Sequence, residues 1–190
     1  MDKGKTDKRE AVLRAALEAF AEFGFHGAPT SLIARKANVG VGTIYRYFEN
    51  KDDLIEEIHE RVHTIIIRSF AEHYDPRLPV RENYLAIFTG LTRLFMANPF
   101  DIRFMEQYYN SPYGIEKKRA DEVECDKPLM DFFDQGKQQQ AIKDLSFEFL
   151  LGLSFGPVLF LVRDHLQGFV DLDDQSITAF VEASWDAIKR

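Results

Sequence analysis

One short segment, residues 30–51, constrains the fold of this 190-residue chain more than any other. Ile33 and Ala34 begin an apolar stripe with helical spacing in its first half. Ile44 and Phe48, which are four residues apart, form a second stripe in its second half. The pattern predicts two short helices that are joined by a tight turn, with both stripes turned inward.

The turn between these two helices is expected at Asn38, because asparagine tolerates the left-handed backbone conformation better than most non-glycine residues. Gly40 can then act as the N-cap of the second helix. The outward positions of that helix are Val41, Gly42, Thr43, Tyr45, Arg46 and Tyr47. Hydroxyl groups donate to phosphates, arginine can bond guanine O6 and N7, and a glycine lets a helix approach the duplex closely. We therefore expect this helix to enter the major groove of DNA. The alternative is a solvated helical hairpin without a partner.

Four motifs of the N-terminal third are similar to one family: residues 20–27 (FAEFGFHG), 33–34 (IA), 39–48 (VGVGTIYRYF) and 50–54 (NKDDL). They resemble the helix-turn-helix domain of TetR-type transcriptional repressors, over about residues 6–60. The resemblance implies that Thr30 and Lys51 hold phosphates, while Ser31 and residues 43–47 face bases and backbone. Gly40 stands where the family usually has serine, so it is not expected to contact DNA. The predicted DNA-binding residues are Thr30, Ser31, Gly42, Thr43, Tyr45, Arg46, Tyr47 and Lys51.

The charge of the chain is divided unevenly between this segment and the rest. Residues 1–50 carry eight Lys and Arg against six Asp and Glu, which gives +2; residues 51–190 carry sixteen against twenty-five, which gives −9, and the two add to the net −7. An acidic body with a mildly basic head is expected to orient on DNA and to discourage indiscriminate binding. Lys3, Lys5, Lys8 and Arg9 are expected to form a flexible basic arm that reaches the duplex, or else a solubilising tail.

Helical periodicity dominates the whole chain, so the predicted class is all-α with about nine helices. Besides the two short helices, helical patterns cover residues 8–23, 52–73, 81–97, 101–110, 146–167 and 173–189, with a less regular segment around 113–139 that is interrupted near Pro128. Gly24 and the run D-P-R-L-P at 75–79 are predicted breaks. We expect a helix-turn-helix DNA-binding domain at residues 1–51 and a helical effector-binding and dimerisation domain at 52–190.

The last two helices are expected to pair with those of a second copy. Segment 146–167 is apolar almost all round, and the final helix carries a stripe that includes Ile177 and Val181. The predicted dimer residues are Gly152, Gly156, Phe180, Ser184, Trp185 and Ile188. A two-fold dimer would read a near-palindrome whose half-sites lie roughly 34–36 Å apart. The alternative is that both helices are core of a monomer.

The second domain is rich in aromatic residues, which suit a pocket for a small, mostly apolar molecule. The residues predicted to contact it are Phe70, Phe88, Phe95, Phe104, Tyr108, Phe132 and Phe155. The resemblance implies a small-molecule effector that releases the protein from DNA, with repression as the commoner outcome. Two alternatives stay open: these aromatics are core alone, or a protein partner regulates the DNA-binding domain.

A different class of function, a zinc-dependent hydrolase, is suggested by His59-Glu60-Arg61-Val62-His63, which matches H-E-x-x-H on a predicted helix. A third ligand at the spacing of one common variant would fall on Ser69, which is not a zinc ligand. Neither a glycine-rich phosphate loop nor a G-x-S-x-G motif is present, and the acidic neighbours of Cys125 disfavour its thiolate. We expect a binding protein without catalytic activity, cofactor or metal.

The composition favours the cytoplasm. Cys125 is the single cysteine, so no disulfide can form within the chain, and a reducing compartment is expected. The N-terminus lacks the apolar core of a signal peptide. The most apolar run, residues 149–162, is too short to span a bilayer and is predicted to be a buried helix, so no membrane partner is expected.

Overall fold

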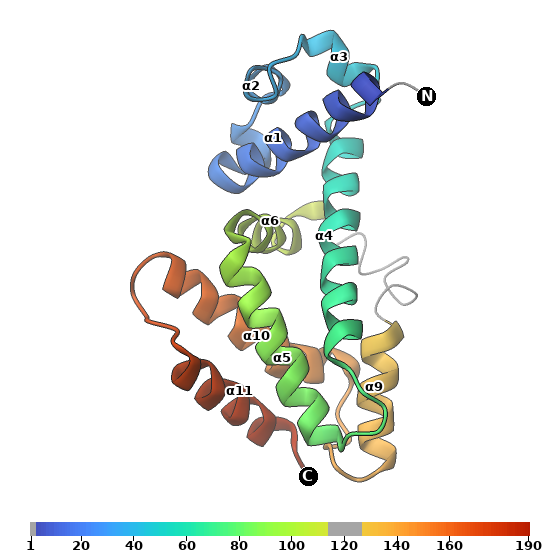
Figure 1. Ribbon diagram of the computed structural model, residues 1–190, viewed down its shortest axis with the longest axis vertical. Coiled ribbons are helices and arrows are strands. Elements are labelled where there is room, and N and C mark those ends of the chain that lie inside the picture. The colour runs from blue at the N-terminus through green and yellow to red at the C-terminus, as the bar shows by residue number, and fades with distance from the viewer. Residues whose placement is uncertain (1–2, 114–126) are drawn as a thin grey trace. The chain divides into compact units, whose positions relative to one another are not determined.

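A computed structural model of the chain describes residues 3–113 and 127–190, with side chains from residue 7 onward. Within these residues its regular secondary structure is helical, apart from one isolated antiparallel bridge between Ile142 and Lys189 (Figure 1). The helices of the described residues are α1 (Lys3–Gly27), α2 (Thr30–Lys36), α3 (Val41–Tyr45), α4 (Lys51–His73), α5 (Val80–Ala97), α6 (Pro99–Tyr109), α9 (Lys127–Gln138), α10 (Phe147–Leu166) and α11 (Asp174–Ile188). The predicted all-α class is confirmed. Cys125 and part of the segment predicted around 113–139 lie outside the described residues.

The helix ends follow from local residue chemistry. Gly24 has φ of 73°, a left-handed conformation that glycine adopts without penalty, and it kinks the chain near the end of α1 as predicted. Asp173 caps α11 by accepting a hydrogen bond from the Ser176 backbone N–H at 2.8 Å. The turn between α4 and α5 is tied by the buried Asn83 side chain, whose amide nitrogen donates to the Asp75 carbonyl at 2.8 Å.

By its internal contacts the described chain forms two compact units. The first takes residues from Met1–Thr64 and Phe100–Ile115, so α6 belongs with α1, α2, α3 and the first part of α4. Aromatic rings fill its core: Phe25 of α1 lies edge-on to Phe20 at 5.4 Å and to Phe104 of α6 at 5.6 Å between ring centroids. This cluster gives α2 and α3 a rigid base.

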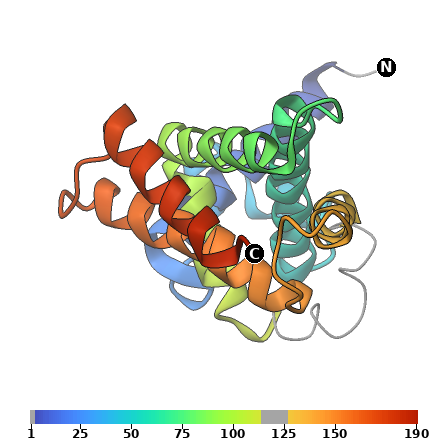
Figure 2. The same cartoon turned by 90° about the horizontal axis from the view of Figure 1, so that it is seen from below.

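The second unit takes residues from Ile65–Pro99 and Glu116–Arg190. Its centre is the three-helix arrangement of α5, α10 and α11, which pack against one another (Figure 2). Tyr84 of α5 is fully buried there, with its ring 5.3 Å from that of Trp185 and its hydroxyl 2.8 Å from Ser184 Oγ. Burial raises the pKa of the Tyr84 phenol, against the opposing effect of its serine neighbours.

The units divide the chain differently from the predicted domains. The packing boundary falls inside α4, between Thr64 and Ile65, and α6 returns to the first unit. The predicted functional boundary after residue 51 stays a prediction. The physical reason for the difference is that α4 and α6 contribute apolar side chains to the base of the helix-turn-helix.

Candidate nucleic-acid interface

The turn between α2 and α3 has the predicted backbone. Asn38 has φ of 53°, in the left-handed region. The Val39 N–H donates to the Ala34 carbonyl at 3.0 Å and closes the end of α2. Gly40 is extended and precedes α3 as its N-cap, and its carbonyl accepts from the Thr43 N–H at 2.8 Å. A left-handed asparagine therefore reverses the chain where the sequence predicted it.

The two faces of α3 also divide as predicted. Ile44 of α3 and Phe48, which follows the end of α3, are 2 % and 4 % exposed, and Ile33 of α2 is fully buried as well. Val41 and Tyr45 are 40 % and 54 % exposed. The remaining outward positions are exposed at Gly42 and Arg46 and half-buried at Thr43 and Tyr47. The exposed apolar and aromatic face of this five-residue helix does not contribute to the core of the unit, which favours binding of an external partner.

Gly42 faces open space. A Cβ atom added there would meet no other atom within 4 Å. The packing of the chain therefore does not require a glycine at this position. The absence of a side chain matters for whatever approaches α3 from outside, which agrees with close approach of a duplex.

Arg46 folds back on its neighbour in this structure. Its guanidinium carbon lies 5.0 Å from the centroid of the Tyr47 ring, and one of its terminal nitrogens donates to the Tyr47 hydroxyl at 2.9 Å. The pair is exposed at Arg46, so the guanidinium can turn outward without breaking a buried contact. Stacking on an aromatic ring pre-orients the planar guanidinium and reduces its freedom.

The first turn of α2 supplies Thr30 and Ser31, half-buried and exposed respectively, directly after the extended Pro29. A helix N-terminus presents backbone N–H groups and is suited to a phosphate. Thr30 and Ser31 lie at the start of α2, and their contacts with phosphate and bases stay predictions.

Lys51, which the resemblance assigns to a phosphate, is already engaged within the first unit, and its contact with a phosphate stays a prediction. Its ammonium group donates to the Phe25 carbonyl, and its Nζ atom lies 5.5 Å from the Phe20 ring centroid. Burial lowers the pKa of Lys51, against the opposing effect of Asp52. Because one of its three donors is used near the end of α1, Lys51 joins α4 to α1, and only its other donors are available to a phosphate.

The predicted flexible basic arm is wrong for Lys8 and Arg9. Helix α1 begins at Lys3, so both residues are helical, and the Arg9 guanidinium forms an ion pair with Glu57 of α4. The side chains of Lys3 and Lys5 lie outside the described residues. Arg9 is held inside the first unit because Glu57 offers a partly buried carboxylate opposite it.

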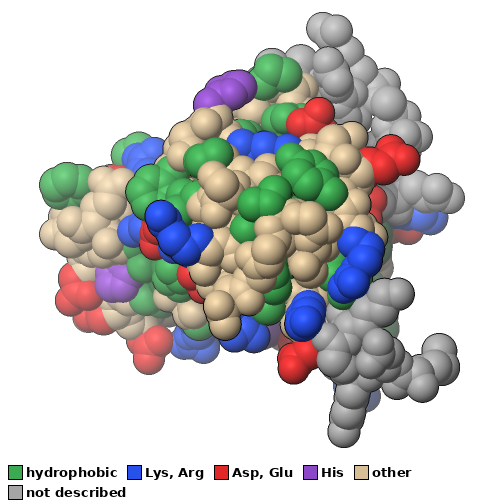
Figure 3. Space-filling view, turned by 90° about the horizontal axis from the view of Figure 1, so that it is seen from above, with side chains coloured by type: hydrophobic (Ala, Val, Ile, Leu, Met, Phe, Trp, Pro, Cys, Tyr) green, Lys and Arg blue, Asp and Glu red, His purple; other side chains and the backbone are tan. Residues whose placement is uncertain are grey.

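The face that carries α2 and α3 is shown in Figure 3. Apolar and uncharged side chains occupy the middle of the view, Lys and Arg groups lie beside them, and acidic groups lie nearer the edge. Several cations of this unit have partners: Lys36 pairs with Glu22 at 3.0 Å, and Arg61 pairs with Glu10 at 2.6 Å. The face therefore combines a modest positive charge with exposed aromatic groups.

The first histidine of the H-E-x-x-H match, His59, packs inside the first unit. The His59 ring is 2 % exposed and stacks on Tyr108 of α6, with centroids 3.9 Å apart and planes at 15°. The rings of His59 and His63 are 6.0 Å apart. Among the described residues no three His, Cys, Asp or Glu side chains are grouped so as to hold a metal ion. The zinc-hydrolase alternative has no support.

The seven aromatics predicted to contact an effector are not brought together. Phe104 and Tyr108 are fully buried in the first unit, where Phe104 packs on Phe20 and Phe25. Their buried rings form the base of the helix-turn-helix, because α6 packs with α1.

The other five belong to the second unit, where four of them form two separate pairs. Phe70 lies 6.2 Å from Phe132, between α4 and α9, and Phe95 lies 5.8 Å from Phe155, between α5 and α10. Phe88 is fully buried. Contact of any of them with an effector stays a prediction.

The predicted dimer residues also separate into two groups. Ser184, Trp185 and Ile188 are buried within their own unit, at 6 %, 5 % and 0 % exposure, so the prediction that they face a second copy is corrected. Ser184 and Trp185 face α5, where both contact Tyr84. Gly152 is exposed, and Gly156 and Phe180 are half-buried.

The surface of α10 supplies residues that the sequence prediction missed. Phe149, Leu153 and Phe160 are 67 %, 37 % and 54 % exposed. Helix α10 is long and apolar enough to cross a membrane, by length and composition only, so the expectation that this run is too short to span a bilayer is wrong. Only 22 % of its most apolar window is buried, so α10 is also not the buried helix that was expected. The sequence signal for these exposed residues was that α10 is apolar on all sides. Neighbouring helices of the same chain cannot cover every face of such a helix, so one apolar face stays exposed.

Comparison with known proteins identifies the family. A family model described as "Tetracyclin repressor-like, C-terminal domain" matches residues 79–189, which is more than half of the chain. A second model, "Bacterial regulatory proteins, tetR family", matches residues 12–58. The chain belongs to the TetR family of transcriptional regulators. Its helix-turn-helix is the DNA-binding domain of such a regulator, and the family resemblance drawn from residues 20–54 is confirmed.

Relatives of this regulator match along its whole length. An uncharacterised HTH-type transcriptional regulator of Haemophilus influenzae is 27% identical, and the match covers 100% of both chains. The crystal structure of a TetR family regulator from Marinobacter aquaeolei has a TM-score of 0.91 at 27% identity, covering 100% of this chain and 99% of the other. That of a putative TetR family regulator from Vibrio parahaemolyticus has a TM-score of 0.79 at 34% identity, covering 96% and 99%. TetR-family proteins are regulators, which are generally not enzymes.

Proposed function

We propose that this TetR-family regulator is a ligand-responsive repressor that binds a palindromic operator as a homodimer in the cytoplasm. A small, mostly apolar effector would release it from DNA. The observation that carries the proposal is the exposed face of α3, where Tyr45 and Arg46 stand outside a helix whose inner residues are buried. Tyrosine hydroxyls suit phosphates, and arginine suits guanine, so this face can both position and read a duplex.

The dimer is supported by the exposed apolar face of α10. Phe149 and Phe160 are more than half exposed, and a Cβ atom added at Gly152 or Gly156 meets no other atom within 4 Å. Covering such a face removes apolar surface from water, worth about 25 cal/mol per Å². A second copy is the natural cover, because a two-fold axis lets the same face serve both chains. A dimer also supplies the second recognition helix that a palindrome needs.

The effector is supported by family membership and by the aromatic residues of the second unit. Phe70, Tyr74 and Phe132 form a cluster in which the Phe70 and Tyr74 rings stack at 5.7 Å. The only polar group of this cluster, the Tyr74 hydroxyl, donates to Gln135 Oε1 at 3.1 Å. A mostly apolar ligand with an aromatic or aliphatic body would match such side chains.

Selection of bound sequences from a random duplex library tests the DNA-binding part of the proposal. We expect enrichment of an inverted repeat, and the recovered duplex should bind far more tightly than a scrambled duplex of the same composition. Recovery of no common sequence at modest ionic strength would reject the operator. Compounds that raise the melting temperature are then tested for release of the recovered duplex. If none of the compounds that raise the melting temperature of the protein releases the duplex, the proposed effector response is rejected for that library.

A further inference from the structure

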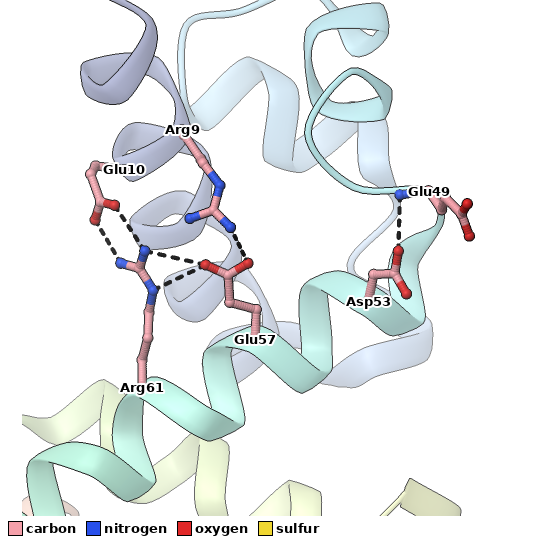
Figure 4. Close-up of polar contacts among 6 residues, drawn as sticks. All are labelled: Arg9, Glu10, Glu49, Asp53, Glu57 and Arg61. Carbon is pink, nitrogen blue, oxygen red and sulfur yellow. Dashed lines mark hydrogen bonds and ion pairs between the residues drawn. The ribbon is translucent and has the colours of Figure 1, made fainter. Parts of the chain in front are cut away.

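A group of four charged residues joins α1 to α4 close to residues 41–48, which we call the recognition segment (Figure 4). Arg61 of α4 binds Glu10 of α1 through two hydrogen bonds of 2.6 and 2.8 Å. It also approaches Glu57, one turn earlier on α4, at 3.2 Å. The other oxygen of Glu57 accepts from Arg9. We call Arg9, Glu10, Glu57 and Arg61 the α1–α4 charge cluster.

Arg9 differs from the other three members because it also contacts the recognition segment. Its guanidinium carbon lies 5.2 Å from the centroid of the Phe48 ring. Phe48 is buried and comes directly after the exposed Tyr45 and Arg46 and the half-buried Tyr47. A single side chain of α1 therefore contacts both α4 and Phe48 at the end of the recognition segment.

The contacts continue from Phe48 toward the reading side chain. The Phe48 ring lies edge-on to Tyr47 at 6.5 Å, and the Tyr47 ring carries the guanidinium of Arg46. The N–H groups of both Tyr47 and Phe48 donate to the Ile44 carbonyl, at 2.9 and 3.0 Å. A shift of the Phe48 ring would consequently move the aromatic surface on which Arg46 rests.

Helix α3 has little stability of its own. It has five residues, and helices shorter than about 12–15 residues are marginal without tertiary contacts. Its direction is therefore set by what its inner side chains touch. The Arg9–Glu57 pair is only partly exposed, 34 % and 23 % at the two side chains, so solvent screens it less than a surface pair.

We infer that Arg9 is a positioning residue for sequence reading: by bridging Glu57 to the Phe48 ring, it holds the Tyr45–Arg46–Tyr47 face at the angle that a specific duplex requires. The inference rests on the proposed binding of a specific operator. Arginine suits this position because its planar guanidinium can pair with a carboxylate and stack on a ring at once. Lysine keeps the charge but offers a compact ammonium without the planar surface.

The test compares Arg9→Lys with wild-type protein on two duplexes, the one recovered by selection and its scrambled counterpart. We expect Arg9→Lys to weaken the selected duplex by about tenfold and to leave the scrambled one within about twofold, because the net charge is unchanged. Arg14→Ala is the matched control, since it removes an exposed arginine of the same helix. It should weaken both duplexes by the same factor.

A coupling measurement separates positioning from a loss of fold. Arg46→Ala should weaken the selected duplex by about tenfold in the wild-type background and by less than about threefold in the Arg9→Lys background. Glu57→Gln, which removes the other end of the bridge with little change of shape, should reduce the effect of Arg46→Ala in the same way. All affinities are measured well below the melting temperature of each variant.

Two results would overturn the inference. One is an equal loss on both duplexes for Arg9→Lys, and the other is an Arg46→Ala effect that is the same in all three backgrounds. If wild-type protein recovers no common sequence, the proposed operator binding fails as well. Recovery by wild-type protein with additive losses in the variants rejects the positioning role alone.

Discussion

At the scale of single residues, we expect Arg46 to contribute most to what the regulator reads. Its guanidinium is pre-oriented on Tyr47 and exposed. Arg46→Ala should weaken operator binding by about 1–3 kcal/mol and relax the preference at one base pair. Binding to a set of operators with single substitutions measures both effects. A uniform loss across that set would show that Arg46 holds a phosphate.

Tyr113 provides a pH test of the described geometry. Burial, together with the Asp52 carboxylate that accepts its hydroxyl at 2.5 Å, raises the pKa of Tyr113 from 10.0 to about 12. Because the folded form favours the protonated phenol, this contribution to stability is complete below pH 10 and is lost as the pH rises toward 12. The difference between the absorbance titrations of wild-type protein and Tyr113→Phe should appear near 12. In Asp52→Asn it should move down; a titration unchanged by Asp52→Asn would contradict the described pair.

Residue-level prediction from the sequence succeeded where the cause is local. The left-handed conformations of Asn38 and Gly24 depend on their own chemistry, and both were predictable. Lys51 was not, since the carbonyl that accepts its hydrogen bond belongs to Phe25, 26 residues earlier. The position of a charged group in a sequence does not reveal which distant partner has already engaged it.

Among the elements, α10 and α11 show what an apolar stripe can and cannot reveal. The stripe of α11 correctly predicted that one face would be covered, but it is covered by α5 of the same chain. Trp185, at 5 % exposure and 5.3 Å from Tyr84, is thus a core residue. Trp185→Ala should lower the free energy of unfolding by about 3–5 kcal/mol, measured by denaturant titration. A stability loss below about 1 kcal/mol would contradict core packing.

The exposed face of α10 makes the opposite prediction. The double change Phe149→Glu with Phe160→Glu adds charge to side chains that are 67 % and 54 % exposed. The chain should keep its helical content and its monomer should remain folded, while the mass in solution falls to that of one chain. Leu78→Glu, at a 43 % exposed position in the turn before α5, is the matched control. If the doubly changed protein stays dimeric, another face of the chain forms the interface.

For the molecule as a whole, ion pairs within the chain reduce the number of cations that are available to DNA. The +2 of residues 1–50 is small, and two of its cations, Arg9 and Lys36, are already engaged within the first unit, as is the adjoining Lys51. The sequence predicted a basic head but could not show how few of its cations remain available. Non-specific attraction to phosphates is therefore expected to be modest, and we expect operator choice to depend on the recognition face and on the proposed binding through two copies.

Binding through two copies makes affinity depend on the spacing of the half-sites. A two-fold dimer places its recognition helices roughly 34–36 Å apart, about one turn of duplex. Inserting five base pairs between the half-sites turns one of them to the opposite side of the helix, so binding should fall to the level of a single half-site. Five base pairs inserted outside the repeat are the control and should change nothing. The Phe149→Glu, Phe160→Glu protein should bind the original repeat and the split repeat equally weakly. A monomer contacts one half-site at a time, so its affinity does not depend on the distance between the half-sites. Tight wild-type binding to the split repeat would mean that each chain reads its half-site independently, and the effector would then have no spacing to alter.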